Sequence, residues 1–130
     1  MSESLMSITP APVAQALIEA LGADQVLLGE DVTSRAAGIW RSDGIKAQIL
    51  VRPRNTEEVS RAMAVCYAHE QPVIAHGGLT GLVQSAITTK EDVVISLERM
   101  NTIEEIHPLE RTAVVQSGVI LQTLQEALFG

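Results

Sequence analysis

Short apolar runs and longer helical patterns alternate along this chain. Four runs have the length and composition of strands, and they lie at residues 48–52, 72–75, 92–97 and 113–116. Their short, continuous apolar character is typical of strands in a sheet that helices cover. The pattern therefore predicts a small sheet with a buried face.

The first two of these strands enclose a helical pattern. This helix is expected to begin at Asn55, which can cap it, with acidic residues in the first turn. Its predicted buried residues are Val59, Ala62, Met63 and Cys66. Strand, helix and strand within about 30 residues indicate a βαβ unit with parallel strands and a right-handed crossover. The predicted fold class is α+β with α/β-like character.

A further helix is predicted near each end of the chain. The first is expected to have Thr9 as its N-cap and Pro10 in its first turn, and to end at Gly22. The last lies in residues 119–130 and places three leucines on one face, Leu121, Leu124 and Leu128.

Residues 27–44 mix small and charged residues and are expected to form a loop with short pieces of structure. Trp40 is predicted to bury part of this loop, because a single large aromatic ring can supply much of the local burial. The alternative places Trp40 or Arg41 near the mouth of an active site.

Composition narrows the possible functions. Of the 130 residues 46% are hydrophobic but only three are aromatic, so the core must be aliphatic. The net charge of −7 argues against nucleic-acid binding, which requires basic patches. The chain has neither a secretory signal pattern nor an apolar run of about 18 residues, so we expect a cytoplasmic protein without a membrane span.

Cys66 is the only cysteine. An intramolecular disulfide and a cysteine-based metal cluster are therefore impossible, and no metal site is predicted. Because Cys66 lies within a helical pattern, we expect it to act as a small buried apolar residue.

A glycine-rich turn follows the second predicted strand, with Gly77, Gly78 and Gly81. Glycines permit positive φ angles and close backbone approach, so successive N–H groups can converge on a phosphate. Residues 71–90 contain no Asp or Glu, and the hydroxyl groups of Thr80 and Ser85 lie nearby in sequence. The spacing fits neither the Rossmann fingerprint nor the P-loop. Taken alone, the turn is either structural or a phosphate-binding loop.

Three sequence blocks extend this interpretation. They are R-P-x-x-T-E-E-V at 52–59, G-G-x-T-G-L at 77–82 and S-L-x-x-M-N-x-I at 96–103. In this order and spacing, residues 30–130 resemble the N-terminal portion of the PCMH-type FAD-binding domain of the vanillyl-alcohol-oxidase-like flavoproteins. The closest branch is similar to the FAD-linked D-lactate, glycolate and D-2-hydroxyglutarate dehydrogenases. Residues 1–29 are then an N-terminal helix and lead-in.

The resemblance implies that the glycine loop wraps the FAD diphosphate and that two further turns approach the cofactor. The implied cofactor-binding residues are His76, Gly77, Gly78, Leu79, Thr80, Gly81, Leu82, Ser85, Pro53, Ser117 and Gly118. Family members that bond FAD covalently use a histidine directly after the two glycines. Because Leu79 occupies that place and has no nucleophilic atom, the resemblance implies FAD bound non-covalently.

The resemblance also implies an oxidoreductase that acts on a 2-hydroxy acid. Enzymes of this family are much longer and carry substrate-binding groups in a separate cap domain. We expect an incomplete module that is not catalytic alone, and no catalytic residue is assigned. The alternative is a non-catalytic fragment or stand-alone α/β domain that a partner chain or self-association completes. A generic nucleotide-binding module is a third possibility.

Overall fold

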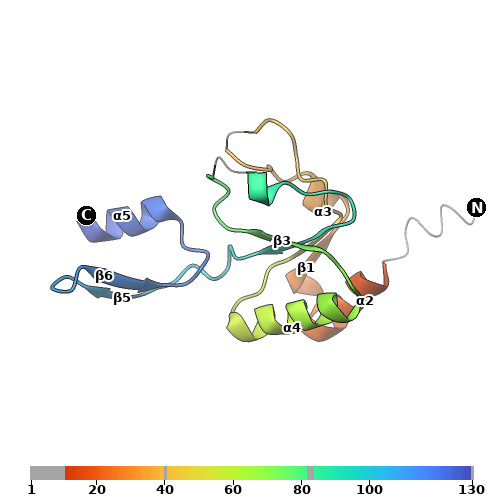
Figure 1. Cartoon of the computed structure of the whole chain (residues 1–130), viewed down its shortest axis with the longest axis horizontal. Coiled ribbons are helices and arrows are strands. Elements are labelled where there is room, and N and C mark those ends of the chain that lie inside the picture. Colours follow the sequence, from red (N-terminus) through yellow and green to blue (C-terminus); the bar gives the residue numbers. More distant parts are fainter. Residues whose placement is uncertain (1–10, 40, 82–83, 130) are drawn as a thin grey trace, which may run out of the picture.

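The computed structural model describes residues 11–39, 41–81 and 84–129. A four-stranded sheet in the order β1-β2-β4-β3 forms the body, and a separate two-stranded sheet pairs β5 with β6 (Figure 1). The elements in chain order are α2 (Pro12–Leu21), η1 (Ala23–Gln25), β1 (Val26–Leu28), α3 (Glu30–Thr33), β2 (Ile49–Val51), α4 (Thr56–Ala68), β3 (Val73–His76), η2 (Gln84–Ala86), β4 (Val93–Ser96), β5 (Ile103–His107), β6 (Thr112–Val115) and α5 (Leu121–Phe129).

The predicted βαβ unit is confirmed. Strands β2 and β3 each pair in parallel with β4, which lies between them, and α4 makes the crossover. Strand β1 pairs antiparallel with β2 and was not predicted. Its three residues are too few to show a period, so only the pairing reveals it.

The two faces of the main sheet are covered differently. Helices α2 and α4 lie side by side on one face (Figure 1), where Leu17 and Cys66 pack with sheet residues such as Val93. The other face carries a smaller cluster in which Val32 and Ile45 pack with Leu50, Val94 and Ala47. Helix α3 and the loop residues Ile45 and Ala47 therefore form this second layer. The burial predicted for Cys66 is confirmed, and burial raises the pKa of its thiol.

Two details of the helix predictions are wrong. Met63 is 47% exposed, because α4 turns the side formed by Glu58, Ala62 and Cys66 inward instead. Glu58 can occupy a buried position since its carboxylate pairs with Arg54.

The start of the first helix also differs. Helix α2 begins at Pro12 after Ala11, which makes no side-chain capping bond, so Thr9 is not its N-cap. Thr9 and Pro10 lie outside the described residues. The predicted end at Gly22 is confirmed, and the Gly22 N–H donates to the Ile18 carbonyl oxygen at 2.8 Å.

Residues 103–129, here called the arm, extend away from the body (Figure 1). The arm contains the β5–β6 hairpin and α5, and none of the α5 residues described is buried. Strand β5 was not predicted, because its residues Ile-Glu-Glu-Ile-His combine apolar side chains with a charged centre. In the described part of the chain, no helix has both the length and the apolar character that crossing a membrane requires.

Candidate functional site

The carboxyl ends of the three parallel strands meet at one edge of the main sheet. The glycine loop, of which the structure describes residues 77–81, follows β3 there, while Pro53 follows β2 and Leu97 follows β4. This edge is where open α/β sheets usually bind ligands. The predicted glycine loop and the turn at Pro53 therefore lie at the same edge, although their residues are far apart in sequence.

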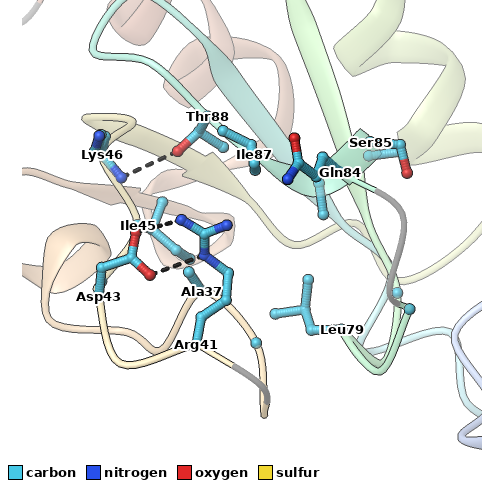
Figure 2. A pocket seen from close by; sticks show the side chains of 16 residues that line it. Ala37, Arg41, Asp43, Ile45, Lys46, Leu79, Gln84, Ser85, Ile87 and Thr88 are labelled. Atoms are coloured by element: carbon cyan, nitrogen blue, oxygen red, sulfur yellow. Dashed lines mark hydrogen bonds and ion pairs between the residues drawn. The ribbon is translucent and has the colours of Figure 1, made fainter.

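A cavity of about 330 Å³ lies beside the glycine loop (Figure 2). Its volume is at the lower end of the range of about 300–1,000 Å³ that is common for small-molecule sites. Four predicted residues line it, namely Gly77, Leu79, Gly81 and Ser85. The other lining residues are Ala37, Gly38, Arg41, Asp43, Gly44, Ile45, Lys46, Ala75, Gln84, Ala86, Ile87 and Thr88.

The opposite wall of the cavity, formed within residues 37–39 and 41–46, was not assigned to the site from sequence, apart from the alternative that placed Trp40 or Arg41 near the mouth of an active site. Two contacts hold this wall against the rest of the site. The buried Thr88 hydroxyl accepts hydrogen bonds from the Lys46 and Ala47 N–H groups at 3.0 and 3.2 Å. The Leu79 carbonyl accepts from the Ile39 N–H at 3.4 Å.

Charge at the cavity is carried by Arg41, Asp43 and Lys46. The Arg41 guanidinium donates two hydrogen bonds to the Asp43 carboxylate, at 2.8 and 2.6 Å (Figure 2). This pairing lowers the pKa of Asp43. One carboxylate against two cations leaves the lining mildly positive, which suits an anionic ligand.

The glycine loop has an unexpected backbone geometry. Positive φ was expected at the glycines, but it occurs at Leu79, where φ is +60°. A leucine in this left-handed region costs about 1–2 kcal/mol. The strain is located at the part of the loop that lines the cavity and contacts the Gly38–Ile39 backbone.

The fold itself does not explain why positions 77 and 81 are glycine. A Cβ built on either Gly77 or Gly81 would meet no heavy atom of the described residues within 4 Å, and neither φ is positive. A Cβ on Gly78 would only touch Ile120 Cγ1 at 4.0 Å, an ordinary contact. The open space beside these backbones is what a phosphate needs in order to reach their N–H groups. The residues present thus fit a diphosphate.

His76 lies at the base of the glycine loop and is buried, with 2% of its surface exposed. Its Nε2 donates to the Ala86 carbonyl oxygen at 2.8 Å. Burial lowers its pKa, the bond to the Ala86 carbonyl raises it in part, and the nearby Arg35 guanidinium lowers it further. The predicted contact of His76 with the cofactor stays a prediction.

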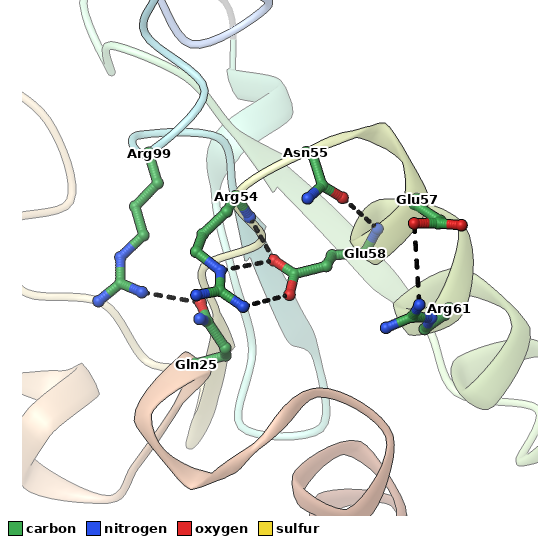
Figure 3. A network of polar contacts seen from close by, with 7 residues as sticks. All are labelled: Gln25, Arg54, Asn55, Glu57, Glu58, Arg61 and Arg99. Carbon is green, nitrogen blue, oxygen red and sulfur yellow. Dashed lines mark hydrogen bonds and ion pairs between the residues drawn. The ribbon is translucent and has the colours of Figure 1, made fainter.

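Pro53 is fully buried at the end of β2 and does not line the cavity. The neighbouring Arg54 donates its backbone N–H to Glu58 Oε1 at 2.7 Å, and its guanidinium reaches both Glu58 carboxylate oxygens (Figure 3). The Asn55 side chain caps α4 by accepting the Glu58 N–H at 2.9 Å, as the sequence predicted. These contacts fix the turn that contains Pro53.

Ser117 and Gly118 lie in the turn between β6 and α5. Gly118 is buried, and its N–H donates to the Met100 carbonyl oxygen at 2.8 Å. Gly78 faces Ile120 just beyond this turn. The structure therefore brings the turn close to the glycine loop, although neither Ser117 nor Gly118 lines the cavity. Leu82 and Trp40 lie outside the described residues.

The strain at Leu79 predicts that a glycine variant is more stable than an alanine variant at this position, which is the reverse of their usual order of stability. Both Leu79→Ala and Leu79→Gly remove the side chain, but only glycine adopts positive φ without cost. We expect Leu79→Gly to be more stable than Leu79→Ala by about 1 kcal/mol. Urea unfolding of the two variants measures this difference, and a more stable alanine variant would contradict the left-handed conformation.

Burial of His76 predicts a loss of stability in mild acid. Its pKa in the folded chain is lowered below the ordinary 6.5, so the unfolded chain binds the proton first as the pH falls. Stability is then complete above pH 6.5 and declines below it, by at most about 1.4 kcal/mol per pH unit. Thermal unfolding from pH 7.5 to 5 measures the decline, and His76→Gln should flatten it.

The carboxylates Asp43 and Glu58 do not interfere with this test. Their pKa values are lowered from 3.8 and 4.5 by their arginine partners, so their contributions are lost only in stronger acid. A wild-type profile that stays flat between pH 7.5 and 5 would contradict the neutral, buried state of His76.

Comparisons with known proteins identify the family of this chain. Residues 47–130 match the family described as an FAD-binding domain. The chain is 36% identical over 77 residues to D-2-hydroxyglutarate dehydrogenase of Stutzerimonas stutzeri, which covers 59% of this chain and 17% of that protein. It is 37% identical over 81 residues to D-lactate dehydrogenase of Archaeoglobus fulgidus, covering 62% of this chain and 18% of that protein.

The fold is also shared with solved structures. An alkyldihydroxyacetonephosphate synthase superposes with a TM-score of 0.76 at 20% identity, over 93% of this chain and 26% of the other. The chain thus spans only a small part of the relatives and structures that it matches. The matched family region begins just before β2 and contains every predicted site residue. This chain therefore belongs to the family of FAD-binding domains, and its cofactor is FAD.

Proposed function

We propose that this chain is the FAD-binding portion of an FAD-dependent oxidoreductase acting on a 2-hydroxy acid, and that the glycine loop holds FAD non-covalently. The observation that carries the proposal is the open space beside Gly77 and Gly81 at the carboxyl ends of parallel strands. The backbone N–H groups of this loop would bind the diphosphate. Leu79 offers no atom for a covalent bond to the flavin.

The substrate class is supported by the relatives. Two of them are named for D-2-hydroxyglutarate and D-lactate, which are both 2-hydroxy acids. When bound, FAD supplies the redox chemistry that oxidises the hydroxyl-bearing carbon of such a substrate. The present chain covers 17% and 18% of these relatives, so the reaction itself is proposed only for a longer polypeptide.

The chain's own part in that reaction is to bind and orient the cofactor. Asp43 is the carboxylate that lines the cavity, and hydrogen bonds from Arg41 lower its pKa. A carboxylate held in this way is a weak base at neutral pH and is poorly suited to remove a proton from a substrate. We assign to Arg41 and Asp43 the role of fixing the cavity wall.

A titration of the purified chain with FAD tests the proposal. Binding to the native state alone raises stability by about 2.7 kcal/mol at a ligand concentration 100 times Kd. We expect FAD to raise Tm and change flavin fluorescence, ADP to compete, and riboflavin, which has no phosphate, not to compete. Acid precipitation should release all the flavin. No response at high micromolar FAD would contradict cofactor binding by this chain alone.

A second candidate, a non-catalytic domain completed by a partner chain, is favoured by the exposed apolar surface of the arm. Leu121, Leu128 and Phe129 are 66%, 44% and 88% exposed. An isolated two-stranded hairpin is only marginally stable, so an added apolar segment would stabilise the arm. Light scattering over a range of concentrations tests self-association: a dimer identifies the partner as a second copy, and a monomer throughout contradicts it.

A further inference from the structure

His76 connects the two ends of the segment that contains the glycine loop. Its Nε2 donates to the Ala86 carbonyl oxygen at 2.8 Å, and its side chain is 2% exposed. The bond therefore joins the start and the end of this segment, of which the structure describes residues 77–81 and 84–86. The bond is partly buried, because the His76 side of it is buried and Ala86 is half-buried, and a hydrogen bond is stronger in such surroundings than in water.

The two ends of this bond belong to different elements. His76 is the last residue of β3, it pairs with Ser96 in the sheet, and its carbonyl accepts the Leu97 N–H at 2.9 Å. Ala86 ends the short helix η2, where the chain returns from the glycine loop. The imidazole thus attaches the returning end of the loop to the fixed edge of the sheet.

The neutral form of the His76 imidazole can donate one hydrogen bond, which is the number observed. Burial and the neighbouring Arg35, which pairs with Glu98, lower the pKa of the imidazole. The neutral ring has one N–H, and the carbonyl partner requires it to be at Nε2.

We propose that His76 is a positioning residue that holds residues 77–81 and η2 in their FAD-binding shape before the cofactor arrives; the cofactor part of this inference rests on the proposed function. Closing a flexible loop costs entropy, which must otherwise be supplied when the ligand binds. With the His76–Ala86 bond in place, the loop N–H groups meet the diphosphate already ordered.

Two substitutions distinguish the effect of the donated hydrogen bond from the effect of the volume of the ring. His76→Gln keeps an N–H donor at nearly the same reach, whereas His76→Leu keeps apolar volume without a donor. In the full chain without FAD, we expect amide hydrogen exchange at Ile87, whose N–H donates to the Gln84 carbonyl oxygen of η2 at 3.3 Å, to be at least about tenfold faster in His76→Leu. In His76→Gln it should stay within about threefold of the wild type, and α4 should exchange equally in all three proteins. The Kd for FAD should likewise be higher in His76→Leu and close to the wild-type value in His76→Gln.

Each other outcome overturns the proposal. Equal exchange in His76→Leu and the wild type, or no rescue by His76→Gln, would show that the bond does not order the loop. Faster exchange in α4 to the same extent as at Ile87 would mean that His76 supports the sheet. Normal exchange but weakened FAD binding in His76→Gln would make His76 a direct ligand. A wild-type chain that binds no FAD contradicts the proposed function, while the exchange comparison still decides the role of His76.

Discussion

Gly118→Ala is expected to destabilise the chain strongly, by about 3 kcal/mol. A Cβ at this position would lie 1.7 Å from the Leu97 carbonyl oxygen and 2.9 Å from the Met100 carbonyl oxygen. Both neighbours are backbone atoms, so no side chain can rotate away to make room. The turn would have to move, which would break the bond from the Gly118 N–H to Met100 and loosen the junction between body and arm.

Urea unfolding and amide exchange at residues 97–100 measure this effect. Gly77→Ala is the matched control, because its Cβ enters open space among the described residues. We expect the control to change the free energy of unfolding by no more than about 0.5–1 kcal/mol. Equal unfolding midpoints for the two variants would show that the 97–100 turn yields easily. The predicted contact of Gly118 with the cofactor is a separate question and stays a prediction.

The βαβ unit could be predicted because its signals are local. Asn55 caps α4, and the strands on both sides of the helix are continuous apolar runs. Strands β1 and β5 could not be found in this way. Each is defined by pairing with a partner, β1 with β2 and β5 with β6, and neither has a clear period of its own.

The same contrast applies to the candidate site. The glycine loop was predicted from consecutive residues after a strand, and it lies within the region that matches the family, while its contact with the cofactor stays a prediction. The wall at residues 37–46 was not predicted, because Thr88 holds Lys46 and Ala47 across separations of 42 and 41 residues. No motif marks such a contact. The requirement for glycine at position 118 likewise depends on the Leu97 carbonyl, which only the folded chain brings near.

The family resemblance did not predict the positive φ angle at Leu79. The family motif drew attention to position 79 as the place of a covalent bond to flavin, and leucine there implied a dissociable cofactor. The motif did not indicate that the backbone is strained here. Leucine is destabilised in a left-handed conformation that glycine or asparagine adopts readily. A strained residue beside a cavity is a common feature of binding sites.

Gly77→Val and Gly78→Val are expected to weaken FAD binding at least about a hundredfold, which corresponds to about 2.8 kcal/mol. A phosphate oxygen must come within about 2.7–3.2 Å of a backbone nitrogen to form a hydrogen bond. The branched side chain of valine would occupy the space beside the backbone that is open in this structure. Stability should change little, because that space holds no heavy atom within 4 Å of a Cβ on Gly77 and only Ile120 near one on Gly78.

Loss of binding without loss of stability distinguishes this result from that of Gly118→Ala. FAD titration by flavin fluorescence gives the affinity, and urea unfolding without FAD gives the stability of the same preparations. Ala64→Val, on the exposed side of α4, adds the same side chain away from the loop and should bind FAD like the wild type. Unchanged affinity in both glycine variants would place the diphosphate elsewhere on the chain. Glycine at these positions would then need another explanation, because the described fold does not require it.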